Sequence, residues 1–268
     1  MPTKSAAPIS YLFVPATRPE RFDKALATGA DRVIIDLEDA VAPADKDTAR
    51  NALTSWLDIG KPVAVRINSS DTEWFARDLA LCGHANVAEV ILPKSGDVAD
   101  VKRVTAAGAR AVKLLIESAQ GIANLTELAA CDKVSRLIFG TLDFCVDMGI
   151  ENDERELDSQ LVLVSRLVGL AAPVDGVTTA IDDAAVLSAD ILRGKRFGFG
   201  AKLCIHPKQV ATVNASYLPQ ADEIAWATRV IDAAGASDGA AVQVDGKMVD
   251  KPVLIKAERI LSLAKRVG

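Results

Sequence analysis

The chain has 268 residues, half of them hydrophobic and a quarter charged, which is enough for one large core. Its net charge of −5, with lysines and arginines scattered along the chain, argues against a nucleic-acid or anionic-membrane surface. No segment reaches the roughly 18 apolar residues of a membrane span, and the polar start MPTKSAAPIS lacks the apolar core of a signal peptide.

The cysteines and histidines indicate a reduced compartment and no zinc site. The cysteines lie far apart without a CxxC pair, and the two histidines do not complete a zinc-ligand pattern. These cysteines are Cys82, Cys131, Cys145 and Cys204. We therefore expect a cytoplasmic protein that is neither secreted nor membrane-integral.

Eight short apolar runs alternate with segments of helical periodicity, the pattern of βα units around a parallel sheet. The runs are apolar throughout, as in VIIDLED and EVILPK, because strands of a parallel sheet are buried on both faces. The predicted strands cover residues 11–16, 32–38, 62–68, 89–94, 112–117, 136–143, 174–179 and 201–206.

Eight such units in succession predict an α/β fold of the (β/α)8 type, a TIM barrel, over residues 1–220. A doubly wound open sheet is the alternative. It is disfavoured because PATRPE follows the first strand, where a glycine-rich phosphate loop would be expected.

Residues 221–268 form a C-terminal extension that barrel closure does not need. We predict a helix over 222–236, a polar stretch over 237–252 and a last helix over 254–267. By composition the extension is either a packing element, which is slightly favoured, or an arm that completes an active site in its own or a neighbouring subunit.

Active sites of this fold lie where the strands end, so polar strand ends are the candidates. For any single polar residue of this kind, exposure to solvent in a loop is a commoner explanation than a functional role. Several of them at one rim indicate a functional site more strongly than each does alone. The candidates are Arg18, Asp36, Glu38, Asp39, Arg66, Asn68, Lys94, Glu117, Asp143, Asp175, Asp182 and His206.

Two acids at neighbouring strand ends predict a metal site. Glu117 and Asp143 can converge on one hard cation, and Mg2+ keeps open water positions for a substrate. Arg66 can face a substrate carboxylate, and Glu38 and Asp39 supply further acceptors beside it. The combination suggests chemistry on a small keto or hydroxy acid.

The motifs resemble those of the citrate lyase β-subunit-like branch of the HpcH/HpaI aldolase superfamily, which includes malyl-CoA and citramalyl-CoA lyases. The resemblance covers nearly the whole chain in one order. Its motifs are LFVPATRPERFDKAL, DLEDAVAPADKDTAR, VRIN, VILPKS, LLIESAQG, FGTLDFCVDMG, DGV with IDD shortly after, and KLCIHPKQV.

The resemblance implies a role for each matching residue. It implies that Glu117 and Asp143 bind Mg2+, with Mn2+ as the alternative, and that Arg66 binds the acid beside the metal. It also implies CoA contacts, and a general acid/base in the tail segment VDGKMVDKP, which resembles the segment that covers an adjacent subunit's site. The CoA contacts are Phe13, Arg18 and Lys24, and the acid/base is Asp250.

The implied activity is that of a carbon-carbon lyase acting by reversible Claisen cleavage of a 3-hydroxyacyl-CoA. Malyl-, citramalyl- or citryl-CoA would give acetyl-CoA, or a homologue, and a 2-oxo acid. The family implies a homotrimer or a multiple of it. The segment reads IES where IET is usual, and TLDF where an acidic or small residue often precedes the aspartate, which leaves the metal ligands in place.

Two alternatives stay open. A CoA-independent class II 2-oxo-acid aldolase of the same superfamily would carry a histidine after the acid of the second strand, but DLEDAVAP has Asp39 there. His206 and His84 cannot replace it by sequence position. A non-catalytic CoA- or acid-binding subunit is opposed by the presence together of Glu117, Asp143, Arg66 and Asp250.

Overall fold

A computed structural model describes residues 7–151, 158–236 and 242–265. The chain divides into two compact units, one over Pro8–Asn214 and one that contains Ala215–Gly268. Among the described residues, no helix combines the length and apolar content that a membrane crossing requires.

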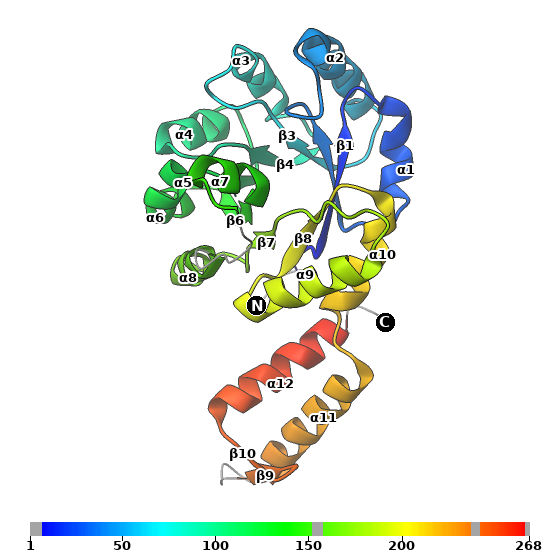
Figure 1. Ribbon diagram of the computed structural model, residues 1–268, viewed down its shortest axis with the longest axis vertical. Coiled ribbons are helices and arrows are strands. Elements are labelled where there is room, and N and C mark those ends of the chain that lie inside the picture. Colours follow the sequence, from blue (N-terminus) through cyan, green and yellow to red (C-terminus); the bar gives the residue numbers. More distant parts are fainter. Residues whose placement is uncertain (1–6, 152–157, 237–241, 266–268) are drawn as a thin grey trace. The chain divides into compact units, whose positions relative to one another are not determined.

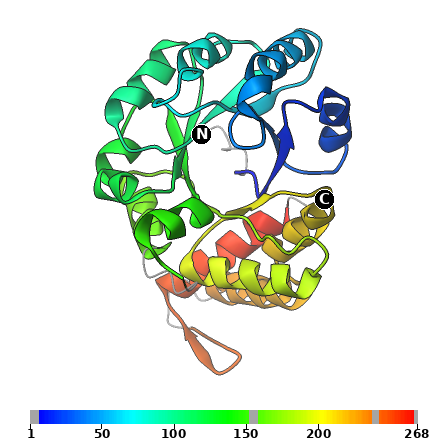
Figure 2. The ribbon, with the colours of Figure 1, turned by 45° about the horizontal axis from the view of Figure 1, so that its top comes forward.

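The first unit is a closed barrel of eight parallel strands in sequence order, ringed by helices (Figures 1 and 2). The predicted (β/α)8 fold is therefore confirmed. The strands are β1 (Ser10–Pro15), β2 (Arg32–Asp36), β3 (Val63–Arg66), β4 (Val87–Leu92), β5 (Val112–Ile116), β6 (Val134–Phe139), β7 (Val174–Asp175) and β8 (Ala201–Cys204).

The helices of this unit follow the strands along the chain. They are α1 (Phe22–Leu26), α2 (Lys46–Leu57), α3 (Phe75–Asp78), α4 (Val98–Ala106), α5 (Ala119–Ala123), α6 (Leu125–Ala129), α7 (Thr141–Met148), α8 (Asp158–Leu167), α9 (Ala184–Phe197) and α10 (Pro207–Tyr217). Several begin at a side-chain cap: Asp97 accepts a hydrogen bond from the Ala99 amide at the start of α4, and Asp183 caps α9 in the same way.

Each strand contributes to a buried apolar cluster: Tyr11, Ile34, Ala64, Ile91, Leu115, Ile138, Val174, Ala201 and Leu203. Side chains from all eight strands thus fill the barrel, as expected when parallel strands are buried on both faces. The strand ends are thereby held at one rim, from which the loops and the polar side chains of the site project.

The structure corrects the predicted end of the sixth strand. β6 stops at Phe139, and Asp143 lies in the first turn of α7 and not on a strand. Phe144 of α7 packs against Phe139 with ring centroids 5.2 Å apart, so the apolar pattern continues across the junction between strand and helix.

The second unit contains two long helices, α11 (Ala221–Ala236) and α12 (Lys251–Ala264), which lie side by side (Figure 1). They share a buried cluster that includes Ala227, Val230, Ala257 and Ile260. The predicted polar stretch between them instead holds an antiparallel hairpin of β9 (Val242–Val244) and β10 (Lys247–Val249). Residues 237–241 of that stretch lie outside the described residues.

Candidate active site at the barrel mouth

A cavity of about 400 Å3 opens at the carboxyl ends of the strands. Side chains and backbone from β1, β2, β3, β5 and the start of α7 meet in it, as the fold requires of its strand ends. The lining residues that matter for chemistry are Phe13, Asp36, Asp39, Arg66, Glu117, Gly140 and Asp143.

Arg66, at the end of β3, is buried among acids that lie at the end of β2 and just after it. Its guanidinium is bidentate to Asp36, with Nε 2.7 Å from Oδ1 and Nη2 2.6 Å from Oδ2. Its third nitrogen, Nη1, lies 2.9 Å from Glu38 Oε2 and 3.4 Å from Asp39 Oδ2. The Phe13 ring covers the guanidinium, 4.8 Å from centroid to Cζ. The bidentate edge of Arg66 is therefore occupied, and Nη1 is the part that faces other acids.

This acid cluster sets the protonation of its members. Burial disfavours the charged form of Arg66, but the carboxylates of Asp36 and Glu38 outweigh it and raise the arginine pKa. Burial raises the pKa of Glu38 to about 8, although the charge of Arg66 opposes the rise. Below about pH 8 the 2.9 Å contact between Arg66 Nη1 and Glu38 Oε2 therefore joins a cation to an uncharged carboxyl group, while the bidentate contact of Arg66 is made with Asp36.

Glu117 follows β5 directly and is almost fully buried. Its Oε1 accepts a hydrogen bond of 2.6 Å from the Lys94 amide, and Lys94 holds an unusual backbone φ of 45°. On its other side Gly140 leaves the necessary space, since a Cβ there would lie 2.5 Å from Glu117 Oε2. Burial raises the pKa of Glu117 to about 7, and the charge of Asp143 contributes to the rise.

The residues present fit a hard divalent cation. Asp143 is exposed on the first turn of α7 and lines the same cavity as Glu117, which it affects electrostatically. Four acids line the cavity together with one arginine, Arg66, and a fifth acid contacts that arginine: Asp36, Asp39, Glu117 and Asp143, and then Glu38. A cation would offset this excess of negative charge, and two carboxylates with free positions for water and substrate suit Mg2+. Over residues 7–151, 158–236 and 242–265, no group of three or more His, Cys, Asp or Glu side chains forms a metal cluster.

A second cavity, of about 490 Å3, lies on the other side of β1 and shares Phe13, Pro15 and Ile205 with the first. Its basic lining comes from Arg21, Lys24 and His206. Cationic side chains beside an apolar wall can hold a phosphate-bearing ligand, and this cavity offers such a lining.

Arg18 and Asp250, two of the predicted site residues, are not among the residues that line these cavities. Arg18 is exposed, lines neither of them, and pairs with Glu20 at 2.7 Å. Asp250 belongs to the second unit, where it is exposed and caps α12 by accepting a hydrogen bond from the Val253 amide. Its position gives it a structural role in that unit whatever else it does.

Sequence reasoning missed several residues that shape the site. Asp36 was a strand-end candidate, but nothing in the sequence marked it as the principal partner of Arg66. Gly140 stands in the FGTLD motif, where a glycine before an acid was the available signal. Arg21 lies in the first motif, LFVPATRPERFDKAL, but the resemblance pointed to Arg18 instead.

Comparison with known proteins gives a consistent result over the whole chain. Residues 10–207 match the HpcH/HpaI aldolase/citrate lyase family. The chain is 36% identical over 274 residues to a citrate lyase subunit beta-like protein of Mycobacterium tuberculosis, with 98% of each chain covered. It is 34% identical over 273 residues to a (3S)-malyl-CoA thioesterase of Cereibacter sphaeroides, covering 97% of this chain and 95% of the relative.

Among solved structures, the chain is similar to CitE from Mycobacterium tuberculosis in complex with magnesium, acetoacetate and coenzyme A. The TM-score is 0.86 at 37% sequence identity, and the match covers 97% of this chain and 99% of the other. The similarity therefore extends beyond the barrel into the C-terminal residues.

Proposed function

Because this chain belongs to the HpcH/HpaI aldolase/citrate lyase family, we propose that it is a Mg2+-dependent carbon-carbon lyase acting on a 3-hydroxyacyl-CoA. Malyl-, citramalyl- and citryl-CoA are the candidate substrates, and the products are acetyl-CoA, or a homologue, and a 2-oxo acid. The observation that carries the proposal is the convergence of Glu117, Asp143 and Arg66 on one cavity that adjoins a basic one.

In this proposal Glu117 and Asp143 hold Mg2+, or Mn2+ in its place. When bound, the cation supplies Lewis-acid polarisation and a template for the hydroxy-acid end of the substrate. Arg66 binds that end through Nη1, the nitrogen that is not committed to Asp36, and Glu38 and Asp39 adjust around it. The low accessibility of Arg66 and Glu117 strengthens their electrostatic contribution.

The CoA moiety is assigned to the basic cavity. Lys24 and Phe13 line it, which supports their predicted role, and Arg21 and His206 add two further polar contacts. Arg18 is half-exposed in a surface ion pair with Glu20, and such a pair is weak enough to exchange partners with a phosphate.

The chemistry assigned to the chain is a proton transfer combined with charge stabilisation. The bond between the hydroxyl-bearing carbon and the α-carbon of the thioester breaks, and its electron pair forms the thioester enolate. The hydroxyl gives its proton to the Asp250 carboxylate and becomes a carbonyl, and Arg66 stabilises the negative charge that develops on this oxygen during the transfer. Asp250 then protonates the enolate carbon, and in the condensing direction it removes that proton.

Thioester hydrolysis is the second candidate, because one relative is named a (3S)-malyl-CoA thioesterase. The same acid and CoA sites would serve, but water would attack the thioester carbonyl. The carbon-carbon bond then stays intact, and the products are free CoA and the hydroxy acid.

One assay separates these activities. The purified protein is incubated with Mg2+ and malyl-, citramalyl- or citryl-CoA, and the products are separated by chromatography. A lyase releases acetyl-CoA with glyoxylate, pyruvate or oxaloacetate, whereas a thioesterase releases free CoA. EDTA and the Glu117→Gln substitution should each abolish turnover. Absence of turnover with every thioester would exclude both activities and leave a binding protein.

The assembly is also part of the proposal. We assign the segment around Asp250 to the active site of an adjacent subunit in a homotrimer or a multiple of it, as the resemblance implies. The support is that the similarity to the relatives includes this segment, since it covers 97–98% of the chain.

A further inference from the structure

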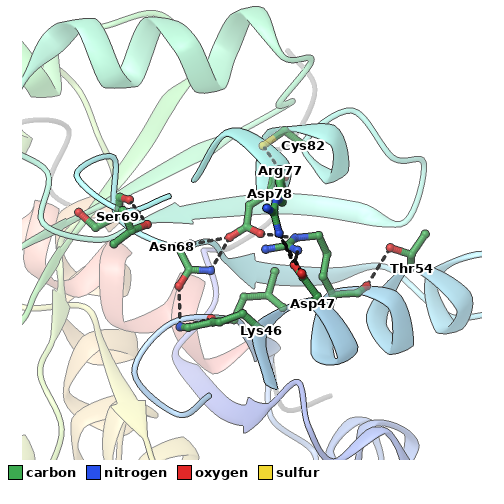
Figure 3. Close-up of polar contacts among 11 residues, drawn as sticks. Lys46, Asp47, Thr54, Asn68, Ser69, Arg77, Asp78 and Cys82 are labelled. Atoms are coloured by element: carbon green, nitrogen blue, oxygen red, sulfur yellow. Dashed lines mark hydrogen bonds and ion pairs between the residues drawn. The ribbon is translucent and has the colours of Figure 1, made fainter. Parts of the chain in front are cut away.

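A buried polar network (Figure 3) is bonded to the acidic segment of residues 36–39, which ends β2 and follows it. It joins the start of α2, the segment after β3 and the end of α3. Its central members are Lys46, Asn68 and Asp78, and all three are almost inaccessible to solvent. None of them lines the cavity. Burying charged groups in this way lowers the stability of the fold unless their hydrogen bonds are complete. The hydrogen bonds of each member therefore show what the network holds in place.

The Lys46 ammonium holds the segment that follows β2. Its Nζ donates to the carbonyl oxygens of Leu37 and Glu38, each at 2.7 Å, and to Asn68 Oδ1 at 2.6 Å. Its three donors are therefore all used. The Trp74 ring closes the remaining side, 5.1 Å from Nζ to the centroid.

The anchor on the other side of Lys46 is rigid. Asp78 Oδ2 accepts from both the backbone and the side-chain amide of Asn68, at 2.8 and 2.7 Å. Asp78 Oδ1 accepts from Arg50 Nε at 2.6 Å. Asn68 cannot rotate without breaking these bonds, so Lys46 ties the acidic segment to a fixed point.

The tied segment is the one that surrounds Arg66. Asp36 accepts hydrogen bonds from the amides of Glu38 and Ala40 while it holds the guanidinium. The carboxyl groups of Glu38 and Asp39, in the same segment of residues 36–39, face Arg66 Nη1. A shift of this backbone would therefore move every acid that competes with a ligand for Arg66.

We infer that Lys46 is a positioning residue, which fixes the backbone of Leu37 and Glu38 so that Arg66 presents Nη1 to the acid end of the substrate. The inference rests on the proposed function. Lys46 touches no substrate in this arrangement and acts through the carbonyls of the acidic segment.

The test uses Lys46→Met, which keeps an unbranched apolar side chain as far as the ε position and removes the ammonium. Titration with pyruvate in the presence of Mg2+ should show a dissociation constant at least about tenfold higher than in the wild type. The dissociation constant of free CoA, whose cavity lies on the other side of β1, should stay within about twofold. Amide deuterium exchange over residues 36–41 should become faster.

Two further variants complete the design. Arg77→Ala is the matched control, because exposed Arg77 bonds only the outer acid Asp47 among the network residues, and it should change none of the three readouts. Asn68→Ala keeps Lys46 but removes its anchor, and it should weaken pyruvate binding and raise exchange in the same direction. It decides the question if Lys46→Met does not fold.

Several results would overturn the inference. The first is a folded Lys46→Met or Asn68→Ala variant that has the pyruvate affinity and the amide exchange of the wild type. The second is an equal loss of pyruvate and CoA affinity, which indicates general destabilisation. Failure of the proposed function is a different result, since the wild-type protein itself would then bind no pyruvate. The exchange over residues 36–41 still decides in that case whether Lys46 holds the segment.

Discussion

Gly140 lies against the buried carboxylate that we assign to the metal. A methyl group at this position would stand 2.5 Å from Glu117 Oε2 and 2.6 Å from Glu117 Cβ, and the buried side chain has little space to retreat. We expect Gly140→Ala to raise the Mg2+ dissociation constant at least about tenfold, measured by titration calorimetry. Gly235→Ala is the control, because a methyl group at that position would have no atom within 4 Å. Unchanged Mg2+ affinity in Gly140→Ala would contradict the assignment of Glu117.

Glu38 makes the stability of the metal-free protein depend on pH. The folded protein keeps its proton up to about pH 8, whereas the ordinary pKa is 4.5, so between these values the folded state binds more protons. The unfolding free energy therefore falls as pH rises through this window. The groups that face Glu38 are Arg66, Asp36, Asp39 and Glu117.

We expect Glu38→Gln to flatten this pH dependence in EDTA. Each pKa unit corresponds to about 1.4 kcal/mol, so the difference between variant and wild type should reach a few kcal/mol across the window. Urea unfolding at a series of pH values between about 5 and 8.5 measures it. Glu117 titrates in both proteins, and the comparison thus isolates Glu38. Parallel curves for the two proteins would show that Glu38 is ionised when folded.

At the scale of the element, Asp250 combines a structural and a proposed chemical role. It caps α12, and Asn is as good a cap as Asp, whereas Ala costs about 1 kcal/mol of stability. We expect Asp250→Asn to keep the melting temperature and lose turnover by at least about a hundredfold. Asp250→Ala should lose both. If Asp250→Asn stays fully active, the residue is a cap and nothing more.

The element boundaries illustrate where sequence patterns stop being informative. Phe139 and Phe144 are both apolar and in contact, so the run through FGTLDF predicts one long strand although a helix starts at Thr141. The hairpin between α11 and α12 does have a sequence signal, an Asp-Gly pair in the polar stretch. Its turn is Asp245-Gly246, with φ of 53° and 75°, which is the pair that tight hairpins favour.

At the scale of the molecule, the barrel follows from the sequence because each buried parallel strand leaves its own apolar run. That Glu117 and Asp143 line one cavity was also predictable, since this needs only the knowledge of which strand ends, and the turns after them, share a rim. The hydrogen-bond partners of Arg66 and Lys46 were not. Asp36 lies opposite Arg66 on the neighbouring strand, 30 residues away, but two uniformly apolar runs do not reveal the register of β2 and β3. Asn68, 22 residues from Lys46, lies in a segment without periodicity after β3.

The proposed shared site makes a prediction about mixed oligomers. Glu117→Gln and Asp250→Asn should each be inactive, but one lacks the metal ligand of the barrel and the other the acid of the tail. If each site takes these residues from two different subunits, unfolding and refolding an equal mixture should restore activity at about a quarter of the sites. Recovery is measured with the thioester assay. No recovery in properly assembled mixtures would place both residues in the same subunit's site.

The acids around Arg66 also couple the binding of the cation to the binding of the acid. An anionic acid approaching the carboxylates beside Arg66 meets repulsion until a divalent cation is present, so the two ligands should bind with positive cooperativity. Such linkage is reciprocal. If Mg2+ raises the affinity for pyruvate by some factor, pyruvate must raise the affinity for Mg2+ by the same factor. The negative charge of the cavity would then make binding of the acid depend on prior or simultaneous binding of the metal.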